Sequence, residues 1–435
     1  MTQSALQRRG YERLDRHALQ ALQLDRLNAL LARILPANRF YAEKLRGVRL
    51  PLESFEQFRE LPLTAKDEIS PTTGGEGGEG GGPALPANLT WPLEQYVRFH
   101  QTSGTHGRPL AVYDTAEDWQ WWVDCWQYVL DAAEVTQRDR AMLAFSFGPF
   151  IGFWSAHEAL AARGALIVPG GGMDSRARLE MIERTGATAL FCTPTYALRL
   201  AEVAAERHID LRRLPVKSIV VAGEPGGSVP SIRQRIESAW NARLVDHAGA
   251  SEVGAWGYAD RQRRGLHVIE SEFIAEFISI AHGGPAAAGE LAQLVLTSLG
   301  RHGMPAIRYR TGDLVRPAWR DDADNNFVLL DGGVLGRADD MLIVRGVNVF
   351  PSAVEQILYG FPEVVEYRLI IRSRGAMDEL SLEVEDRLGD PRRIADELYL
   401  RLGLRVDVRL APPSSLPRFE GKARRLVDER DTAIQ

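Results

Sequence analysis

The chain has 435 residues, with 52 basic and 58 acidic side chains, a formal net charge of −6 and 45% hydrophobic residues. This length exceeds what one hydrophobic core supports, so at least two domains are expected, and the composition excludes a disordered chain. The mildly acidic balance argues against a dedicated nucleic-acid binder or a protein that binds anionic membranes.

Cysteine content and the N-terminal sequence bear on the compartment. Cys125 and Cys192 are too few for a disulfide framework and lack the spacing of a structural zinc site. The first residues contain no apolar core of a secretory signal, and no stretch approaches the ~18 apolar residues of a membrane span. We therefore expect a cytoplasmic protein with reduced thiols.

The first 300 residues predict helices followed by a parallel α/β unit. Leucine and isoleucine recur at helical spacing before Pro36, and the glycine-rich segment 74–83 is interpreted as a surface loop because its two glutamates would repel a pyrophosphate. The expected strands are residues 141–145, 165–169, 189–192 and 218–222, and the expected helices are residues 153–163, 179–185 and 196–206. This alternation is typical of a parallel sheet with helices on both faces.

The remainder of the chain is strand-rich. After residue 272 the pattern predicts antiparallel strands, for example 291–297. A short polar joint, 336–340, precedes a segment with a β-α-β-β-α-β pattern. Its expected strands are 341–344, 366–371, 380–384 and, last, 406–410, with helices from about 351 and over 391–402. The sequence thus predicts an α/β protein of two domains, 1–336 with a parallel-sheet core and 337–435 as a small α+β domain.

The segment 101–109, Gln-Thr-Ser-Gly-Thr-His-Gly-Arg-Pro, is typical of a phosphate-binding loop. Glycines let backbone N–H groups approach a phosphate, hydroxyls donate to its oxygens, and Arg108 adds positive charge. It is not a Walker A loop, because GxxxxGK[ST] does not occur in the chain. The alternative is a polar turn between two strands.

Further candidate segments lie at predicted strand ends. A glycine-rich turn, 223–227, follows an apolar strand, where ligands of parallel sheets usually bind. Glu252, beside Ser251 in a loop of small residues, suits Mg²⁺ next to phosphates, although a solvated turn carboxylate is the alternative. Asp313 follows Tyr309-Arg310-Thr311-Gly312 and suits ribose hydroxyls.

Lysine usage singles out one residue near the C-terminus. Only four of the 52 basic residues are lysines, and Lys422 lies on a loop after Gly421. A compact ammonium can follow a developing charge where a planar guanidinium fits poorly. Lys44, Lys66 and Lys217 are expected at the surface.

Together and in this order, these segments resemble the adenylate-forming superfamily of acyl-CoA synthetases, adenylation domains and luciferases, and within it the phenylacetate-CoA ligase family. The matching motifs are 102–109, Gly223-Glu224-Pro225, Ser251-Glu252-Val253-Gly254, Tyr309-Arg310-Thr311-Gly312-Asp313, 336–340, 345–351 and Gly421-Lys422. The resemblance implies a large N-terminal domain that binds nucleotide and acid, and a mobile C-terminal domain that carries Lys422. It also implies two half-reactions, in which an acid is adenylated by ATP and then transferred to a thiol.

The resemblance assigns roles to individual residues. Lys422, Ser251 and Glu252 are the catalytic candidates, and Glu252 is the Mg²⁺ ligand. The ATP and AMP contacts are assigned to Thr102, Ser103, Gly104, Thr105, Gly107, Gly223, Glu224, Pro225, Asp246, His247, Ala248, Asp313 and Arg337. Asp339 is the hinge, and Arg345 and Gly346 belong to the loop on the coenzyme A side. The acid pocket is assigned to Phe147, Phe150, Trp154, Ala250 and Gly254, although core packing is the common fate of such aromatic residues.

Three positions depart from the family pattern. Ala248 stands where the family usually has an aromatic ring, and the neighbouring His247 is a candidate substitute for it. His106 replaces a hydroxyl, and Arg108 stands where lysine is commoner. A missing ring would remove a stacking face worth roughly 1 kcal/mol.

The leading hypothesis is an AMP-forming aryl-acid–CoA ligase that uses ATP, Mg²⁺ and coenzyme A on a phenylacetate-like or benzoate-like acid. An alternative, favoured by Ala248 and His106, passes the acyl group to a carrier-protein thiol or an amine. A third hypothesis is a nucleotide-binding protein without catalysis. We expect no nucleic-acid or membrane partner, and leave open a homodimer and a carrier protein.

Overall fold

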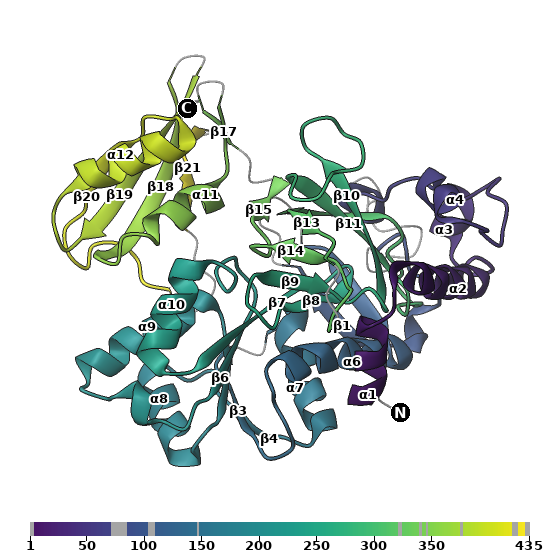
Figure 1. Ribbon diagram of the computed structural model, residues 1–435, viewed down its shortest axis with the longest axis horizontal. Coiled ribbons are helices and arrows are strands. Elements are labelled where there is room, and N and C mark those ends of the chain that lie inside the picture. Colours follow the sequence, from purple (N-terminus) through teal and green to yellow (C-terminus); the bar gives the residue numbers. More distant parts are fainter. Residues whose placement is uncertain are drawn as a thin grey trace, which may run out of the picture.

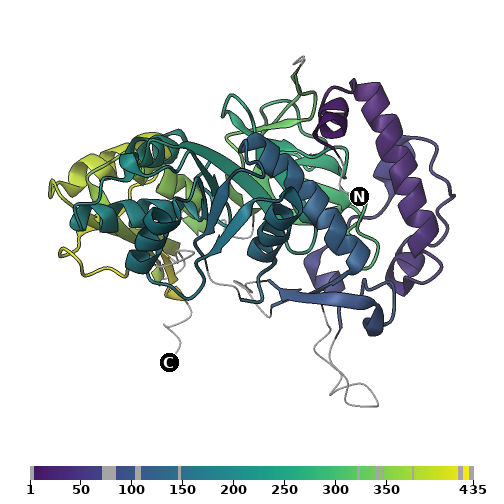
Figure 2. The same ribbon diagram turned by 90° about the horizontal axis from the view of Figure 1, so that it is seen from below.

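The structure is a computed structural model that describes residues 4–70, 85–102, 109–145, 148–320, 324–338, 342–344, 347–374, 377–419 and 425–430. The C-terminal elements form a lobe at one end of the molecule, and the long helix α2 (Arg16–Ile34) lies at the opposite end in both views (Figures 1 and 2). None of the helices in these ranges is long and apolar enough to cross a membrane.

A nine-stranded mixed sheet forms the centre of the larger lobe, in the order β13-β14-β9-β8-β7-β6-β5-β3-β4. Its parallel half consists of β3 (Arg140–Leu143), β4 (Leu166–Pro169), β5 (Ala189–Cys192), β6 (Ser218–Val221) and β7 (Arg243–Ala250). Its antiparallel half consists of β8 (Gly254–Ala259), β9 (Gly265–Val268), β13 (Pro317–Ala318) and β14 (Leu329–Asp331). The direction changes at β7, where the chain turns back through the Glu252 segment.

Helices cover both faces of the parallel half (Figure 1). These helices are α6 (Ala116–Ala132), α7 (Ile151–Arg163), α8 (Ser175–Thr185), α9 (Pro194–Glu206) and α10 (Pro230–Trp240). Alternation along the strands divides the core, since Ile219 and Val221 join the cluster under α8–α10 while Val220 joins the cluster under α6 and α7. Both faces are therefore apolar, as the continuous hydrophobic runs predicted.

Smaller units surround this sheet. The N-terminal helices are α1 (Ala5–Glu12), α2, α3 (Arg39–Lys44), α4 (Phe55–Glu60) and α5 (Lys66–Ile69), and the short 3₁₀ turns are η2 (Leu93–Gln95) and η3 (Leu211–Arg213). A two-stranded ribbon comprises β1 (Tyr96–Gln101) and β2 (Ala111–Thr115). A second, antiparallel sheet comprises β10 (Phe273–Ser279), β11 (Ala292–Ser298), β12 (Tyr309–Val315) and β15 (Gly336–Arg337). Leu27 and Leu30 of α2 pack against Ile274 of this sheet.

The C-terminal lobe has its own hydrophobic core. The lobe contains the hairpin β16 (Leu342–Val344) and β17 (Val347–Val349), then α11 (Pro351–Leu358), β18 (Val364–Arg374), β19 (Met377–Asp386), α12 (Pro391–Leu402), β20 (Asp407–Leu410) and β21 (Leu426–Asp428). The sheet order is β20-β19-β18-β21. Val354 of α11 and Leu398 of α12 pack on the face of Leu369 and Leu382, so this lobe folds around a separate core.

The predicted fold class, an α/β protein with a parallel core and a small α+β unit, is confirmed, and β11 is antiparallel as expected. Several elements were not predicted. The last predicted strand is 406–410, whereas β21 follows it and pairs in parallel with β18. Helix α6, which has four buried tryptophans, was not predicted either. The domain boundary at 336/337 stays a prediction, and the segment 74–83 lies outside the described residues.

Candidate active site

The β1–β2 ribbon brings the two ends of the predicted phosphate loop together. Gln101 pairs with Ala111 across the ribbon. The backbone N–H of the buried Thr102 donates to the carbonyl of Leu110 at 3.0 Å, and the Thr102 hydroxyl accepts from the Leu110 N–H at 3.0 Å. The strands on either side of the predicted loop are therefore antiparallel neighbours. Ser103, Gly104, Thr105, His106, Gly107 and Arg108 lie outside the described residues, so their phosphate contacts stay a prediction.

The turn after β6 begins with the predicted adenine segment, Gly223, Glu224 and Pro225. The Glu224 carboxylate accepts hydrogen bonds from the backbone N–H of Thr195, at 2.8 Å, and from the Thr195 hydroxyl. Gly223 has a φ of +92°, which a residue with a side chain rarely adopts. The turn is therefore held against the N-terminus of α9, at the carboxyl end of the parallel strands.

The side chain of Asp246 ties this turn to β7. Its carboxylate accepts from the Ser228 hydroxyl at 2.5 Å, and a Cβ on Gly227 would lie 2.4 Å from it, so only glycine fits there. Burial is the main cause that raises the pKa of Asp246 to about 6. Asp246 lies on β7 beside the turn. Its contact with the nucleotide stays a prediction.

His247 is not in a position to replace the missing aromatic ring at Ala248. Its ring contacts Trp126 of α6 in a tilted arrangement with centroids 4.2 Å apart, and its Nδ1 lies 2.7 Å from the Gly257 carbonyl. Burial is the main cause that lowers the pKa of His247 to about 4, so the imidazole is neutral at pH 7 and Nδ1 donates. Successive side chains of a strand point to opposite faces. The side chains of Asp246 and Ala248 therefore point to one face of β7, and that of His247 points to the other. The interpretation of His247 as a substitute ring is therefore wrong.

Glu252 is largely buried and lies in the turn between β7 and β8. Arg301 holds this turn by donating to the Ser251 carbonyl at 2.8 Å, and Ser298 donates to the Val253 carbonyl at 2.8 Å. The Glu252 Oε1 atom lies 3.3 Å from the Nζ atom of Lys66. The catalytic candidate thus faces a lysine that the sequence analysis had placed at the surface without a role.

The position of Lys66 follows from a strand contact. Thr64 forms an isolated parallel bridge with Tyr309, in which the Thr64 N–H donates to the Arg308 carbonyl and the Arg310 N–H donates to the Thr64 carbonyl, both at 2.9 Å. This contact fixes the first residue of α5 beside β12. Burial, and then the nearby Glu252 carboxylate, raise the pKa of the Tyr309 hydroxyl well above its usual range.

The predicted ribose residue and the predicted joint residue also meet here. Asp313 of β12 pairs with Arg337 of β15, and the Oδ1–Nη1 distance is 3.3 Å. Both side chains interact with Tyr309. The charges of Glu252, Arg337 and Asp313 all act on the pKa of Tyr309, and Lys66 is connected to this group through its ion pair with Glu252.

The assigned acid pocket is described in part. Phe150 is the N-cap residue of α7 and is 42% exposed, and the Trp154 indole N–H donates to the Gly148 carbonyl at 2.9 Å. Ala250 packs half-buried against the core. A Cβ on Gly254 would lie 2.7 Å from Trp121, so packed rings occupy that side and Gly254 leaves no free space there. Phe147 lies outside the described residues.

Several assigned residues cannot be placed. Asp339, Arg345, Gly346 and Lys422 lie outside the described residues. Within the described residues, no group of three or more His, Cys, Asp or Glu side chains could hold a metal ion. Mg²⁺ in nucleotide sites is usually bound by one or two carboxylates together with substrate phosphates, and Glu252 fits that donor set. Lys66 already places a positive charge beside this carboxylate.

Known proteins match nearly the whole chain. Residues 54–269 match the family model of AMP-binding enzymes, and residues 346–430 match that of the AMP-binding enzyme C-terminal domain. The chain is 31% identical to the phenylacetate-coenzyme A ligase of Thermus thermophilus, over 96% of this chain and 98% of that protein. It superposes on a crystal structure of 2-hydroxyisobutyryl-CoA ligase in the postadenylation state with a TM-score of 0.89 and 25% identity, over 99% of this chain and 94% of that one.

The same ligase in the thioesterification state, with coenzyme A, gives a lower TM-score of 0.71 at 26% identity and the same coverage of both chains. The two comparisons differ in the state of one protein. The arrangement of the lobes in this chain is therefore more similar to that of the postadenylation structure.

Proposed function

Because this chain belongs to the phenylacetate-coenzyme A ligase family of AMP-binding enzymes, and is thus an AMP-forming acid–thiol ligase, we propose that its acid substrate is an arylacetic or benzoic acid. ATP, coenzyme A and a carboxylic acid are the reactants. In the first half-reaction, a carboxylate oxygen attacks the α-phosphorus of ATP and pyrophosphate leaves. In the second, the thiolate of coenzyme A attacks the acyl carbon and AMP leaves.

The roles proposed for the described residues follow from their charges and contacts. Asp313 accepts hydrogen bonds from the ribose hydroxyls while Arg337 holds its carboxylate in place. Glu252 would hold Mg²⁺ beside the phosphates, and a bound cation there offsets negative charge that develops on the phosphate oxygens. Lys66 orients Glu252 and adds a second positive charge.

The remaining roles belong to residues that the structure does not describe. The loop from Ser103 to Gly107 binds the phosphates, and Lys422 contacts the reacting groups in the adenylation step. The domain 337–435 rotates about Asp339, and the loop with Arg345 and Gly346 then approaches coenzyme A. Closure by a mobile domain would exclude water from the labile acyl adenylate.

An aromatic acid is favoured by one relationship in particular. The similarity to a phenylacetate-coenzyme A ligase extends over nearly all of both chains. Phe150 and Trp154, at the start of α7, are two of the residues assigned to the acid, and they supply aromatic surface. The structural similarity does not choose the acid, because that ligase was crystallised with the adenylate of a short hydroxy acid.

A pyrophosphate-release screen tests the proposal. Phenylacetate, benzoate and their ring-substituted forms are compared with 2-hydroxyisobutyrate and acetate, each with ATP and Mg²⁺ and with or without coenzyme A. We expect release with the aromatic acids and formation of their CoA thioesters. Release with the aliphatic acids alone would refute the aromatic substrate. An adenylate formed from an aromatic acid but transferred only to a carrier-protein thiol or an amine would favour the alternative acceptor.

A further inference from the structure

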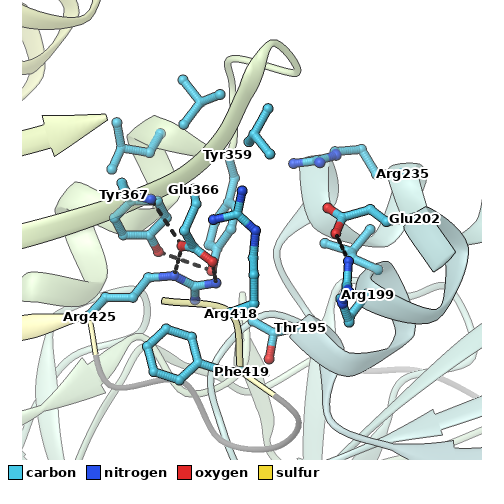
Figure 3. Close-up of a pocket in the computed structure, with 14 residues that line it drawn as sticks. Thr195, Arg199, Glu202, Arg235, Tyr359, Glu366, Tyr367, Arg418, Phe419 and Arg425 are labelled. Atoms are coloured by element: carbon cyan, nitrogen blue, oxygen red, sulfur yellow. Dashed lines mark hydrogen bonds and ion pairs between the residues drawn. The ribbon is translucent and has the colours of Figure 1, made fainter. Parts of the chain in front are cut away.

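A pocket lies between the two lobes, and none of the residues assigned above to ATP, the acid or coenzyme A lines it. One side is formed by Thr195, Arg199 and Glu202 of α9 and by Arg235 of α10. The other side is formed by the C-terminal lobe, including Tyr359, Glu366, Tyr367, Arg418 and Arg425 (Figure 3).

The lining carries an excess of positive charge. Its charged members are the arginines Arg199, Arg235, Arg418 and Arg425 and the glutamates Glu202 and Glu366. In Figure 3 the guanidinium groups of Arg235 and Arg418 project from opposite lobes into the gap. A site lined by convergent guanidinium groups favours an anion, and above all a phosphate, whose oxygens match their paired donors.

Three of these arginines are already partly paired. Arg425 donates to Glu366 at 2.5 and 3.2 Å, Arg418 donates to Glu385 at 2.7 and 3.1 Å, and Arg199 donates to Glu202 at 3.2 Å.

Arg235 differs from the other three arginines. It has no ion pair or hydrogen bond from its side chain to any residue that the structure describes, although it is only half-exposed. Each guanidinium has five N–H donors and no acceptor, so Arg235 brings a full set of unused donors to a pocket in which the acceptors are already engaged. Among the described residues, no acceptor in the pocket is left to pair with Arg235, so these donors are available to an acceptor-rich anion.

We propose that this pocket binds a phosphate group, with Arg235 and Arg418 as its ligands from opposite lobes, and that its occupation stabilises the present arrangement of the lobes. The pocket is complete only while α10, which carries Arg235, and the segment after β20, which carries Arg418, face each other. A ligand that binds one arrangement better than another shifts the equilibrium toward it. Thr195 in the same wall also holds Glu224, so the bound anion would be connected to the predicted adenine turn.

This arrangement is more similar to that of the postadenylation structure than to that of the thioesterification structure. An occupied pocket therefore slows the second half-reaction and leaves the first unaffected. This consequence rests on the proposed two-step function, whereas binding of the anion does not.

Titration calorimetry with inorganic phosphate on the full chain tests the binding. Arg235→Ala is compared with wild type and with Arg207→Ala, which removes an exposed arginine from the end of α9 outside the pocket. Because removal of a hydrogen bond to a charged group usually weakens binding by a factor of ten or more, we expect roughly tenfold weaker binding for Arg235→Ala only. Equal binding by all three proteins, or none by wild type at tens of millimolar phosphate, overturns the proposal. Thermal unfolding curves confirm that each variant is folded.

The source of the phosphate is distinguished by a second titration with adenosine 3′,5′-bisphosphate, the nucleotide part of coenzyme A. If Arg235→Ala weakens both ligands by a similar factor, free phosphate suffices. If it weakens the nucleotide by a larger factor than it weakens phosphate, coenzyme A supplies the group. In the kinetic arm, phosphate should slow acyl transfer from a synthetic acyl adenylate in wild type and not in Arg235→Ala. Loss of that kinetic effect with binding retained would overturn the coupling to lobe arrangement and would leave the ligase activity itself untouched.

Discussion

Removal of the Lys66 ammonium is the most direct test of the site geometry, because no local sequence pattern pointed to it. In Lys66→Ala the Glu252 carboxylate loses the cation at 3.3 Å. Glu252 would then be free to rotate away from the position in which it meets Mg²⁺ and the phosphates. We expect adenylation to be impaired and acyl transfer from a preformed adenylate to be nearly unaffected.

The size of the effect follows from the distance and the exposure of the two groups. At 3.3 Å, two unit charges attract by about 1.3 kcal/mol in water and about 5 kcal/mol at an effective dielectric constant of 20. The Lys66 side chain is 43% exposed and that of Glu252 is 11% exposed, so screening keeps the interaction in the lower part of this range. About 1 to 2 kcal/mol corresponds to a loss of roughly five- to thirtyfold in kcat/KM for ATP.

The assay measures pyrophosphate release as a function of ATP and Mg²⁺, with Lys44→Ala as a matched control. Lys44 also pairs with a glutamate, Glu68, but has no contact with Glu252. We expect the loss in Lys66→Ala to appear with a raised KM for Mg²⁺, and Lys44→Ala to remain within about twofold of wild type. Unchanged adenylation in Lys66→Ala, or an equal loss in both half-reactions, would refute the reasoning.

Three further predictions concern other residues. Lys422→Ala should lower pyrophosphate release by at least about a hundredfold and leave transfer from a synthetic adenylate intact, because the cation is needed only where charge develops on the phosphates; equal loss in both steps contradicts this. Ala248→Tyr should strengthen ATP binding about fivefold, since it restores an aromatic ring at the position where the family usually has one; calorimetry with ATP measures this. Burial would raise the pKa of Asp139, but its hydrogen bonds, led by that from Lys217, outweigh burial and lower it to about 2. This carboxylate therefore contributes stability above about pH 4 that is lost as the pH falls toward 2, and in Lys217→Met acid unfolding should begin at a higher pH.

The parallel sheet was predictable because its strands are apolar throughout and separated by helical stretches. Residues 189–192 and 218–221 are buried on both faces, which is the condition that produces such continuous runs. Strand β21 was not predictable in the same way. It has three residues and is only half-buried, and its partner β18 lies more than fifty residues earlier in the chain. Its pairing depends on tertiary contacts that no local pattern records.

The site was predictable where a motif is continuous in sequence and not where the chain must fold to complete it. Glu252 and Asp313 were identified from their neighbours in the sequence, and in the structure the charges of both act on the pKa of Tyr309. Lys66 lies 186 residues before Glu252 and reaches it only because Thr64 pairs with Tyr309. Its rarity was a usable signal, since just four lysines occur, but the sequence analysis applied that signal to Lys422 alone.

Strand β7 explains why one departure from the family pattern has no compensation nearby. Asp246 and Ala248 lie on the side of β7 that faces the turn after β6, while His247 faces α6 and contacts Trp126. A ring could move from position 248 to 247 only by a shift of one residue, which would send every side chain of β7 to the wrong face. The register is fixed by Val221 opposite Asp246 and by His247 opposite Tyr258. Because Ala248 is predicted to contact the nucleotide, ATP affinity is the property in which we expect the missing ring to be seen.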